Sequence, residues 1–391
     1  MSKTKISVIV GVVLALLIVA SGVIVVPRFL NASQKPTRPN ITYHRSAELA
    51  QPDHSAQSTV AVQSQTANNP WGITIDEQHG LVWVAEPGCD PTPVCQSTFP
   101  SVIGEYSQAD GSLIENFKEP DSTYSSPLFV TLDNQGDVWF TEPTTDHIGE
   151  LIPSTNIWHQ WPLPKGTIPY DLLFDKNGNL WFTEFGSSAI GFFNPRTQLY
   201  VQTLLPTANS NPYGITMDIH GNIWFTENAL NVEKIGTFTP TTTGKIQITE
   251  YSVPFKQPHL ITSDKNGNIW FSGAFEGTIG KFDPATGVTQ TYLVSLFCKQ
   301  ITTGICETHI SGIVIDSHDN VWFTDSLGGR VGYLVPSSGQ VFEAILSKHD
   351  AHPHDGLAID NYGTIWFTEE FNFQLDMWPA DTWQTQTAPA K

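Results

Sequence analysis

The clearest feature of the sequence is a short alternating phrase that recurs seven times. In the fourth copy it reads Gly221-Asn-Ile-Trp-Phe-Thr-Glu227, and its Trp stands at positions 83, 139, 181, 224, 270, 322 and 366. The intervals between these tryptophans are 56, 42, 43, 46, 52 and 44 residues. Strict alternation of this kind predicts a β-strand, and a fixed period predicts a repeat architecture.

Each copy contains four β-type runs. In the fourth copy they are residues 212–218, 223–227, 234–238 and 246–251. Four strands per repeat at this period are typical of a propeller blade. We therefore predict an all-β, seven-bladed β-propeller of four-stranded blades over residues 69–391. The run 375–386 should complete the seventh blade, and residues 58–63 could add an outermost strand that protects a sheet edge.

Alternation also predicts which side chains lie between blades. Trp224 and Thr226 share one face of their strand, and Phe225 and Glu227 share the other. Both faces should be buried because each blade packs against two neighbours. The seven tryptophans are therefore predicted to pack between blades and to carry no chemistry themselves.

The N-terminal segment differs from the repeats. Ile6 to Val26 is a run of apolar or small residues without charge, which at about 1.5 Å per residue spans roughly 30 Å, enough to cross a bilayer. Lys3 and Lys5 precede it and should stay in the cytoplasm. We predict that residues 1–27 form a transmembrane helix that anchors an extracytoplasmic protein; cleavage near Ala20 to Gly22, followed by secretion, is the alternative.

Residues 28–68 are rich in Ser, Gln, Pro, Thr, Asn and Ala and are predicted to form a flexible extracytoplasmic linker. Beyond it, four cysteines form two local pairs, Cys89 with Cys95 and Cys298 with Cys306. Their even number, the short loops and the exported location favour disulfides, whereas a zinc site would favour CxxC spacing.

Composition narrows the functional classes. With 19 basic and 38 acidic residues the formal charge is −19, so nucleic acid is not an expected partner. No Ser-His-Asp arrangement, P-loop or dinucleotide fingerprint is recognisable. We also expect the protein to be a monomer.

The candidate site lies where the inner strands open onto the central channel. The residue after the first Pro, or its counterpart, of each inner strand forms one series: Trp71, Leu128, Tyr170, Tyr213, His259, His309 and His354. The last three are all histidines, and Glu307, His352 and Asp355 are their neighbours in sequence. This cluster predicts a ligand or metal site, with a polar channel lining as the alternative.

A second series consists of carboxylates at the end of the second strand: Glu86, Glu142, Glu184, Glu227, Asp325 and Glu369. A single active site does not need six copies of one residue, so we expect these carboxylates to accept hydrogen bonds between blades. Glu370 differs, because a second carboxylate at this place occurs only in the blade of His354.

The phrases Pro-Tyr-Gly-Ile-Thr, Gly-Asn-Ile-Trp-Phe-Thr-Glu and Lys-Ile-Gly resemble the repeats of the virginiamycin B lyase family, over residues 69–386. The resemblance implies a seven-bladed propeller that inactivates cyclic depsipeptide antibiotics by β-elimination. It also implies a divalent metal, typically magnesium, and a histidine base.

Residue by residue, the resemblance implies that His354 is the base, Glu370 a metal ligand and His309 a substrate contact. His352 stands where the family has a second metal-binding Glu, which exchanges an oxygen donor for a nitrogen. A register shifted by one blade is the alternative: it makes His259 the contact and takes Glu307 and His309 as metal ligand and base. In this shifted register, the residue that corresponds to Glu370 is Ser326.

Two functions therefore remain open. As an enzyme, the protein would be a carbon–oxygen lyase that opens a cyclic ester or lactone, with Trp71, Tyr170 and Tyr213 holding a ring-rich substrate. As a non-enzymatic surface propeller, it would bind a peptide-like ligand, glycan or protein at the same channel mouth.

The cysteine pairing gives a direct test. Thiol counting on unreduced, denatured protein should find no free thiol, because both pairs are predicted to be oxidised outside the cytoplasm. Four free thiols would contradict either the export or the pairing.

Overall fold

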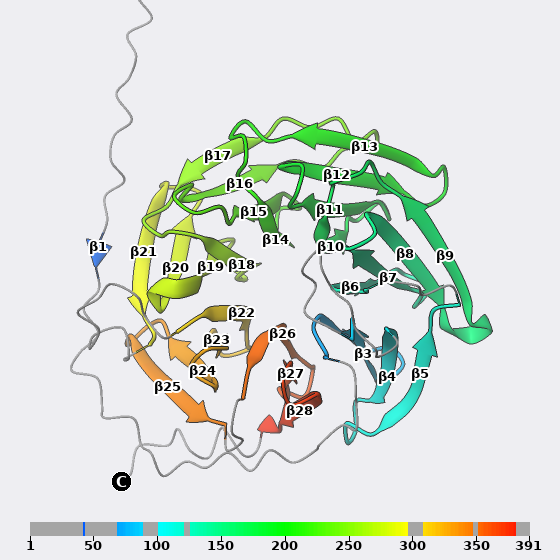
Figure 1. Ribbon diagram of the computed structural model, residues 1–391. Coiled ribbons are helices and arrows are strands. Elements are labelled where there is room, and N and C mark those ends of the chain that lie inside the picture. Colours follow the sequence, from blue (N-terminus) through cyan, green and yellow to red (C-terminus); the bar gives the residue numbers. More distant parts are fainter. Residues whose placement is uncertain are drawn as a thin grey trace, which may run out of the picture. The chain divides into compact units, whose positions relative to one another are not determined.

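Seven small antiparallel sheets are arranged radially around a centre in the computed structural model (Figure 1). The structure describes residues 42–43, 69–88, 101–120, 126–295, 308–346 and 351–380. The chain divides into two units, 1–38 and 39–391, and only the second contains described residues. The predicted all-β, seven-bladed propeller of four-stranded blades is confirmed.

The blades follow one another along the chain. Blade one contains β2 (Ile73–Asp76), β3 (Leu81–Glu86), β4 (Val102–Ser107) and β5 (Leu113–Lys118). Blade two contains β6 (Val130–Leu132), β7 (Val138–Glu142), β8 (His147–Ile152) and β9 (Ile157–Pro162), with the short 3-10 helix η1 (Pro153–Thr155) before β9. Blade three contains β10 (Pro169–Phe174), β11 (Leu180–Glu184), β12 (Ala189–Asn194) and β13 (Leu199–Leu204).

Blade four contains β14 (Pro212–Met217), β15 (Ile223–Glu227), β16 (Lys234–Phe238) and β17 (Thr249–Ser252). Blade five contains β18 (Pro258–Ser263), β19 (Ile269–Gly273), the 3-10 helix η2 (Ala274–Glu276), β20 (Thr278–Asp283) and β21 (Val288–Leu293). Blade six contains β22 (Ile310–Ile315), β23 (Val321–Asp325), β24 (Arg330–Val335) and β25 (Gln340–Ile345). Blade seven contains β26 (Pro353–Ile359), β27 (Ile365–Glu369) and β28 (Gln374–Trp378).

The edges of two blades differ from the predictions. Blade seven has three strands among the described residues, and the remainder of the predicted run 375–386 lies outside them. A short strand, β1 (Thr42–Tyr43), pairs in parallel with β21 of blade five. The proposed extra strand at residues 58–63 lies outside the described residues.

Other predictions also fall outside this part of the chain. They are the apolar run 6–26, the linker apart from β1, the four cysteines Cys89, Cys95, Cys298 and Cys306, and Glu307. Within the described ranges, no helix has the length and apolar character needed to span a bilayer.

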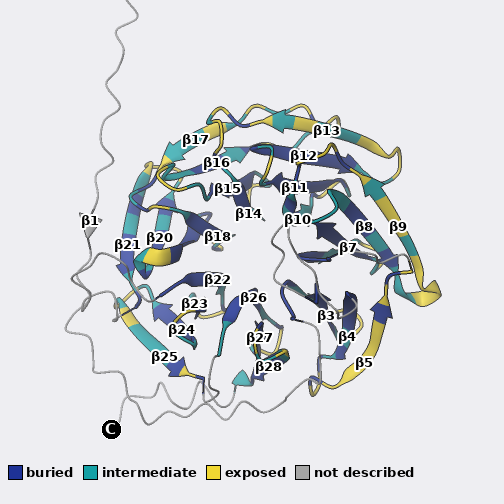
Figure 2. Cartoon of the chain, viewed as in Figure 1, coloured by how far each residue is buried: buried dark blue, intermediate teal, exposed yellow. Residues whose placement is uncertain are grey.

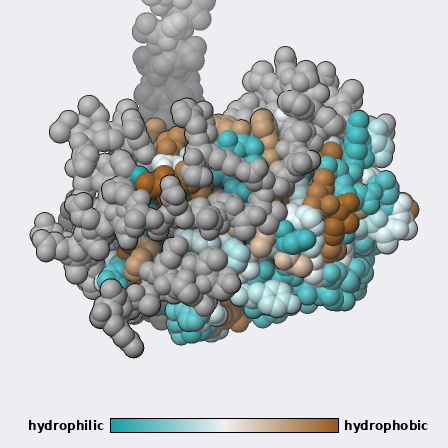
Figure 3. Space-filling view, turned by 90° about the horizontal axis from the view of Figure 1, so that it is seen from below, coloured by the Kyte–Doolittle hydropathy of each residue, from teal (hydrophilic) through white to brown (hydrophobic). Residues whose placement is uncertain are grey.

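The repeated tryptophans lie between blades, as predicted. Trp224 of blade four packs with Ile261 and Phe271 of blade five, and Trp366 of blade seven packs with Val82 and Val84 of blade one. The second strand of every blade is buried almost throughout, whereas the outer strands are partly exposed (Figure 2). On the side shown in Figure 3, hydrophilic and hydrophobic residues are interspersed.

An aspartate six residues before the Trp fixes the first hairpin in six of the seven blades. In blade four, Asp218 Oδ1 accepts the backbone N–H groups of His220 and Asn222 at 2.8 and 2.9 Å. Its Oδ2 accepts the indole N–H of Trp224 at 2.9 Å. The same indole bond occurs at Asp133, Asp175, Asp264, Asp316 and Asp360. One carboxylate thus ties the turn to the tryptophan that contacts the next blade.

Hydroxyl groups connect neighbouring blades and close the ring. Thr183 and Thr324 donate to the backbone oxygens of Tyr213 and His354 in the following blades, both at 2.6 Å. Thr368 of blade seven donates in the same way to Trp71 of blade one at 2.7 Å. A Cβ on Gly356 would lie 2.0 Å from that Trp71 oxygen, so only glycine permits this approach.

The carboxylates at the ends of the second strands mostly bond within their own blade, so the predicted bonds between blades are wrong for them. Glu184 accepts hydrogen bonds from Ser187, Tyr200 and Gln202, and Glu369 accepts from the backbone of His352. These partners lie on adjacent strands and turns of the same sheet. The residues are therefore structural, as the repetition indicated.

We expect Asp218→Ala to lower the free energy of unfolding by about 3 kcal/mol, because it leaves the buried indole N–H of Trp224 and two turn amides without their acceptor. Denaturant unfolding followed by Trp fluorescence measures this. Asp283→Ala is the control, since Asp283 accepts similar bonds in an exposed turn and its loss should cost about 0.5 kcal/mol or less. Equal losses would contradict the role given to Asp218.

Buried glutamates predict that stability falls as pH rises above neutrality. Burial raises the pKa of Glu86 to about 8, although the Tyr106 hydroxyl that it accepts at 2.6 Å lowers it, and burial with nearby Glu250 raises the pKa of Glu227 to about 7. The unfolded chain loses these protons near pH 4.3, so the folded state binds more protons up to about pH 8. The stabilisation is complete below the unfolded pKa and is lost as pH rises through 7 to 8.

The denaturation midpoint should therefore be higher at pH 6.5 than at pH 8.5. Glu86→Gln should reduce this difference, whereas Glu115→Gln on exposed β5 should leave it unchanged. Below about pH 6.5 the buried histidines act in the opposite direction, because the pKa values of His309 and His352 are lowered and the unfolded chain binds their protons first. A midpoint that rises from pH 6.5 to 8.5 would contradict the assignment.

Candidate functional site

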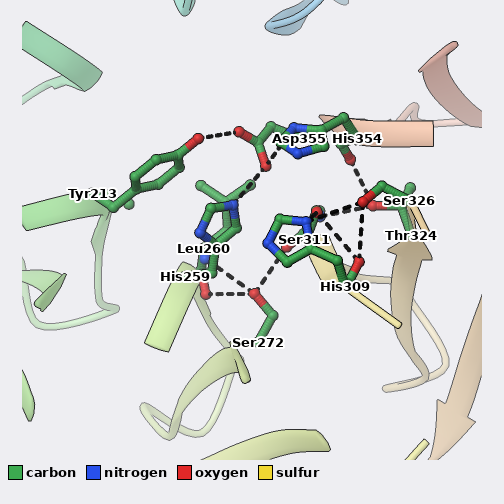
Figure 4. A network of polar contacts seen from close by, with 12 residues as sticks. Tyr213, His259, Leu260, Ser272, His309, Ser311, Thr324, Ser326, His354 and Asp355 are labelled. Carbon is green, nitrogen blue, oxygen red and sulfur yellow. Dashed lines mark hydrogen bonds and ion pairs between the residues drawn. The ribbon is translucent and has the colours of Figure 1, made fainter. Parts of the chain in front are cut away.

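The inner strands bring a cluster of histidines and aromatic rings together at the start of each blade (Figure 4). The ring of His309 lies 4.8 Å from that of His259 and 5.2 Å from that of His354, centroid to centroid, and His259 lies 6.1 Å from His354. His352 stacks nearly parallel to His354 at 5.4 Å. Four histidines from three consecutive blades therefore share one centre.

The backbone register corrects the predicted equivalence of the three histidines. In blades four, five and six, the first paired residue of the inner strand is Pro212, Pro258 and Ile310, respectively. Tyr213 and His259 follow it directly, but His309 precedes Ile310. Ser311 thus holds the place of Tyr213, and His309 corresponds to His352, which precedes Pro353 in blade seven. The prediction treated His309 as preceded by a Pro counterpart, and that alignment is wrong by two residues.

Blade seven contains one additional residue in the same irregular stretch. The paired positions Pro258 and Ile261 of blade five are three apart in sequence, whereas Pro353 and Leu357 of blade seven are four apart. At this insertion two consecutive side chains, His354 and Asp355, both contact the central cluster. Such bulges redirect side chains and are frequent at functional sites.

Asp355 is the hub of the cluster. Its Oδ2 accepts the hydroxyl of Tyr213 at 2.5 Å and the indole N–H of Trp71 at 3.1 Å. Its Oδ1 lies 3.0 Å from Nε2 of His259 and 3.3 Å from Nδ1 of His354. Groups from blades one, four, five and seven thus meet at one buried carboxylate.

The electrostatics of the hub favour an ionised aspartate. Burial alone would raise the pKa of Asp355, but His354 and His259 outweigh it and hold that pKa well below the usual carboxyl value. Burial, together with the positive charge that His259 and His354 carry when protonated, lowers the pKa of His309 well below 6.5. His309 is therefore neutral at neutral pH, beside a permanent negative charge.

Hydrogen bonds orient two of the histidines. Nδ1 of His309 lies 3.0 Å from the hydroxyl of Ser326 and 3.2 Å from that of Ser311, so we assign it as the acceptor and place the ring proton on Nε2. Nδ1 of His259 accepts from the amide of Asn228 at 3.1 Å, which leaves its Nε2 to donate to Asp355. His259 therefore has a partner at both ring nitrogens.

His352 and Glu370 form a separate pair beside the hub. Nε2 of His352 lies 3.4 Å from Oε2 of Glu370, whose Oε1 accepts from the amide of Asn69 at 3.4 Å. Burial, followed by the charge of nearby His354, lowers the pKa of His352 to about 4. The pair is therefore a neutral imidazole next to a carboxyl group at physiological pH.

Aromatic side chains line the centre and its rim. Trp71 and Tyr213 are buried, and each donates a hydrogen bond to Asp355. The ring of Tyr170 lies 4.8 Å from that of Tyr213, centroid to centroid. Two phenylalanines that sequence reasoning did not identify are about half exposed: Phe275 stacks on His309 at 4.6 Å, and Phe371 stacks on His352 at 4.2 Å. The polar centre thus has an apolar rim.

The described residues at the centre do not fit a magnesium ion. Mg²⁺ requires a nearly octahedral set of oxygen ligands, but both oxygens of Asp355 are occupied. Nearby Asp171 accepts the backbone N–H groups of Leu172 and Ile215, and Glu370 lies beside the nitrogen of His352. The three-residue set of potential metal ligands found in the described part of the chain is Asp133, Asp137 and Glu150, in blade two rather than at the centre. We therefore derive no chemical step through a metal.

Sequence reasoning placed Asp355 only as a neighbour of the histidines and missed Ser311, Asn228 and Asn69. Asn69 begins the first blade and reaches Glu370 of the last, so ring closure brings it to the site. Ser326 entered the analysis only through the shifted register, as the counterpart of Glu370. The structure supports that correspondence of positions, because the backbone N–H groups of Ser326 and Glu370 donate to the oxygens of His309 and His352, respectively.

Fold and site together define a seven-bladed propeller with a histidine and carboxylate centre where the inner strands begin. A profile of the virginiamycin B lyase family matches residues 97–304, more than half of the chain. The chain belongs to the virginiamycin B lyase family. Among curated proteins, no significant match was found.

Solved structures agree with this assignment. A streptogramin B lyase structure is 25% identical with a TM-score of 0.66, covering 79% of this chain and 93% of that one. Selenomethionine-substituted virginiamycin B lyase from Staphylococcus aureus gives the same identity and TM-score, with 80% and 95% of the two chains covered. So does a catalytically inactive His-to-Ala variant of the S. aureus enzyme crystallised with quinupristin, with the same coverage.

Proposed function

We propose that this protein is a carbon–oxygen lyase that opens a cyclic ester or lactone by β-elimination, with His354 as the base. The observation that carries the proposal is the placement of His354 against ionised Asp355, with neutral His309 on its other side. Membership of the lyase family supports it. The catalytically inactive His-to-Ala variant of the S. aureus enzyme also supports it, since a histidine is essential there.

The geometry assigns a role to each of the two histidines. In this proposal the charge of Asp355, 3.3 Å from Nδ1 of His354, favours a proton on that nitrogen, which leaves Nε2 with the lone pair that a base needs. His309 presents its Nε2 proton because Ser311 and Ser326 hold Nδ1. A neutral imidazole donor can stabilise the enolate that forms when a proton leaves the carbon next to a carbonyl.

The reaction then balances without water. His354 takes the proton from the α carbon, and the electron pair forms a carbon–carbon double bond. The bond between the β carbon and the ester oxygen breaks, and that oxygen leaves as part of a carboxylate. The ring opens with no change in mass.

The alternative is a non-enzymatic propeller that binds a peptide-like ligand at this centre. The saturation of Asp355 and His259 by hydrogen bonds favours it, because a fully satisfied network is also what a polar lining requires. Under either function we propose that residues 1–27 anchor the protein in the membrane and that it acts outside the cytoplasm as a monomer.

Incubation of the full-length protein with quinupristin, followed by mass spectrometry and chromatography, tests the lyase proposal. We expect an opened product of unchanged mass, formed with EDTA as well as with Mg²⁺ or Mn²⁺. His354→Ala should slow the reaction by about 10² to 10⁴, the usual worth of a general base. His220→Ala, an exposed histidine in the turn before β15, is the matched control and should be fully active.

Asp355→Asn provides a second readout. Removal of the negative charge lowers the pKa of a neighbouring imidazole, so the acid limb of the kcat/KM profile should move to lower pH as the rate falls. A product heavier by one water would show hydrolysis and contradict the mechanism. If the wild-type protein opens no ring with any divalent ion, the lyase proposal fails and the binding function replaces it.

A further inference from the structure

Three exposed apolar side chains lie beside the histidine centre. They are Phe275, Leu327 and Phe371, which are 47%, 53% and 53% exposed and come from blades five, six and seven. Single exposed apolar residues are common and need no explanation, but several of them around one site indicate a contact surface. We call these three the rim residues.

The repeat shows that this apolar character is confined to three blades. Each rim residue lies two positions after the end of its second strand, at Gly273, Asp325 or Glu369. Blades one to four have small residues at the same position: Gly88, Thr144, Gly186 and Ala229. A large apolar side chain is therefore not needed there for a blade to fold. It occurs in the blades that also supply the four clustered histidines.

The residues just before two of the rim positions connect the rim to the site. The hydroxyl of Ser326 in blade six lies 3.0 Å from Nδ1 of His309. Oε2 of Glu370 in blade seven lies 3.4 Å from Nε2 of His352. The backbone N–H groups of these two residues also donate to the oxygens of the same histidines. One residue of the segment thus holds a histidine, and the next presents an apolar side chain.

Two rim residues stack directly on histidine rings. The ring of Phe275 lies 4.6 Å from that of His309, with an angle of 16° between the planes. The ring of Phe371 lies 4.2 Å from that of His352, at 18°. Burial lowers the pKa of both histidines, so they are neutral at pH 7 and put no positive charge beneath the phenylalanines. About half of each phenylalanine remains accessible to a ligand.

The proposed reaction brings part of the substrate to this surface. In a β-elimination, the base acts on the α carbon and the ester oxygen leaves the neighbouring β carbon. Under the proposed roles of His354 and His309, side chains that the substrate ring carries next to the ester therefore lie close to the phenylalanine that stacks on His309. An aromatic side chain gains most from such a surface, because offset and edge-to-face contacts between rings are favourable beyond the area they bury.

We propose that the rim residues bind an aromatic side chain that the substrate carries next to the ester to be opened. The substrate class is then an aryl-substituted cyclic depsipeptide rather than a simple lactone. This inference rests on the proposed lyase function, because it specifies the substrate of the same site. Trp71 and Tyr213, which the sequence suggested for this role, are instead buried and bonded to Asp355.

Calorimetry with two cyclic depsipeptide lactams tests the surface apart from the chemistry. An amide replaces the ester in both, so neither ring opens by elimination; one compound carries a phenyl group next to this amide and the other a methyl group. We expect the full-length protein to bind the phenyl compound more tightly by about tenfold or more. In the double variant Phe275→Ala/Phe371→Ala the two affinities should become similar.

Controls separate ligand contact from folding. Tyr362→Ala should keep the full preference for the phenyl compound, because Tyr362 is 77% exposed at the other end of the hairpin of β26 and β27. The double alanine variant should keep the thermal midpoint, since small residues hold this position in four blades. Phe275→Leu/Phe371→Leu should retain part of the preference, because leucine keeps apolar surface without an aromatic ring.

The corresponding esters separate this inference from the lyase proposal. For the phenyl ester, the double alanine variant should raise KM by about tenfold with little change in kcat, as expected for contacts made equally in the ground and transition states. Equal binding of the two lactams by the wild-type protein, binding of neither at millimolar concentration, or an unchanged preference in the double variant would overturn the rim, even if both esters were opened. Rim-dependent binding of the phenyl lactam without opening of either ester would support the rim and contradict the lyase.

Discussion

The carboxylate that joins each inner turn to its tryptophan is the interaction on which the ring depends. Asp218 and its counterparts accept two turn amides and one buried indole N–H, so a single side chain fixes both the first hairpin and the direction of the ring that contacts the next blade. Without it, a buried indole would lose its acceptor at a cost of about 1 to 3 kcal/mol in each of the six blades that have this aspartate. Because each blade contacts only its two neighbours, small errors in the direction of the tryptophan ring would accumulate around the propeller.

A scaffold fixed in this way lets function arise from small local departures. The second and third strands pair in the same register in every blade, and the differences are concentrated where the inner strands begin. One inserted residue in blade seven is enough to bring both His354 and Asp355 to the centre.

The period of the tryptophans predicted the number and order of the blades because that residue has one physical role in every copy. The site was less predictable, because the role of each residue there depends on the register of its strand. A shift of one residue moves a side chain to the other face of a strand, and sequence spacing did not show that His309 precedes its strand while His259 lies within it. Asp355 was visible only as a neighbour of His354, because its partners Tyr213, Trp71 and His259 come from three other blades.

For the proposed lyase, the donor set at the centre is the reason that we assign the chemistry to histidines. A hard cation would need oxygens, yet Asp355 directs its oxygens to Tyr213, Trp71, His259 and His354. This arrangement uses the negative charge to orient imidazoles rather than to hold an ion. Low pKa values keep His309 and His352 neutral near pH 7, so each ring can donate a hydrogen bond through one nitrogen and accept one through the other. Under the proposed lyase function, His352 therefore stands where a hard cation would need an oxygen donor, and Asp355 serves to orient imidazoles instead.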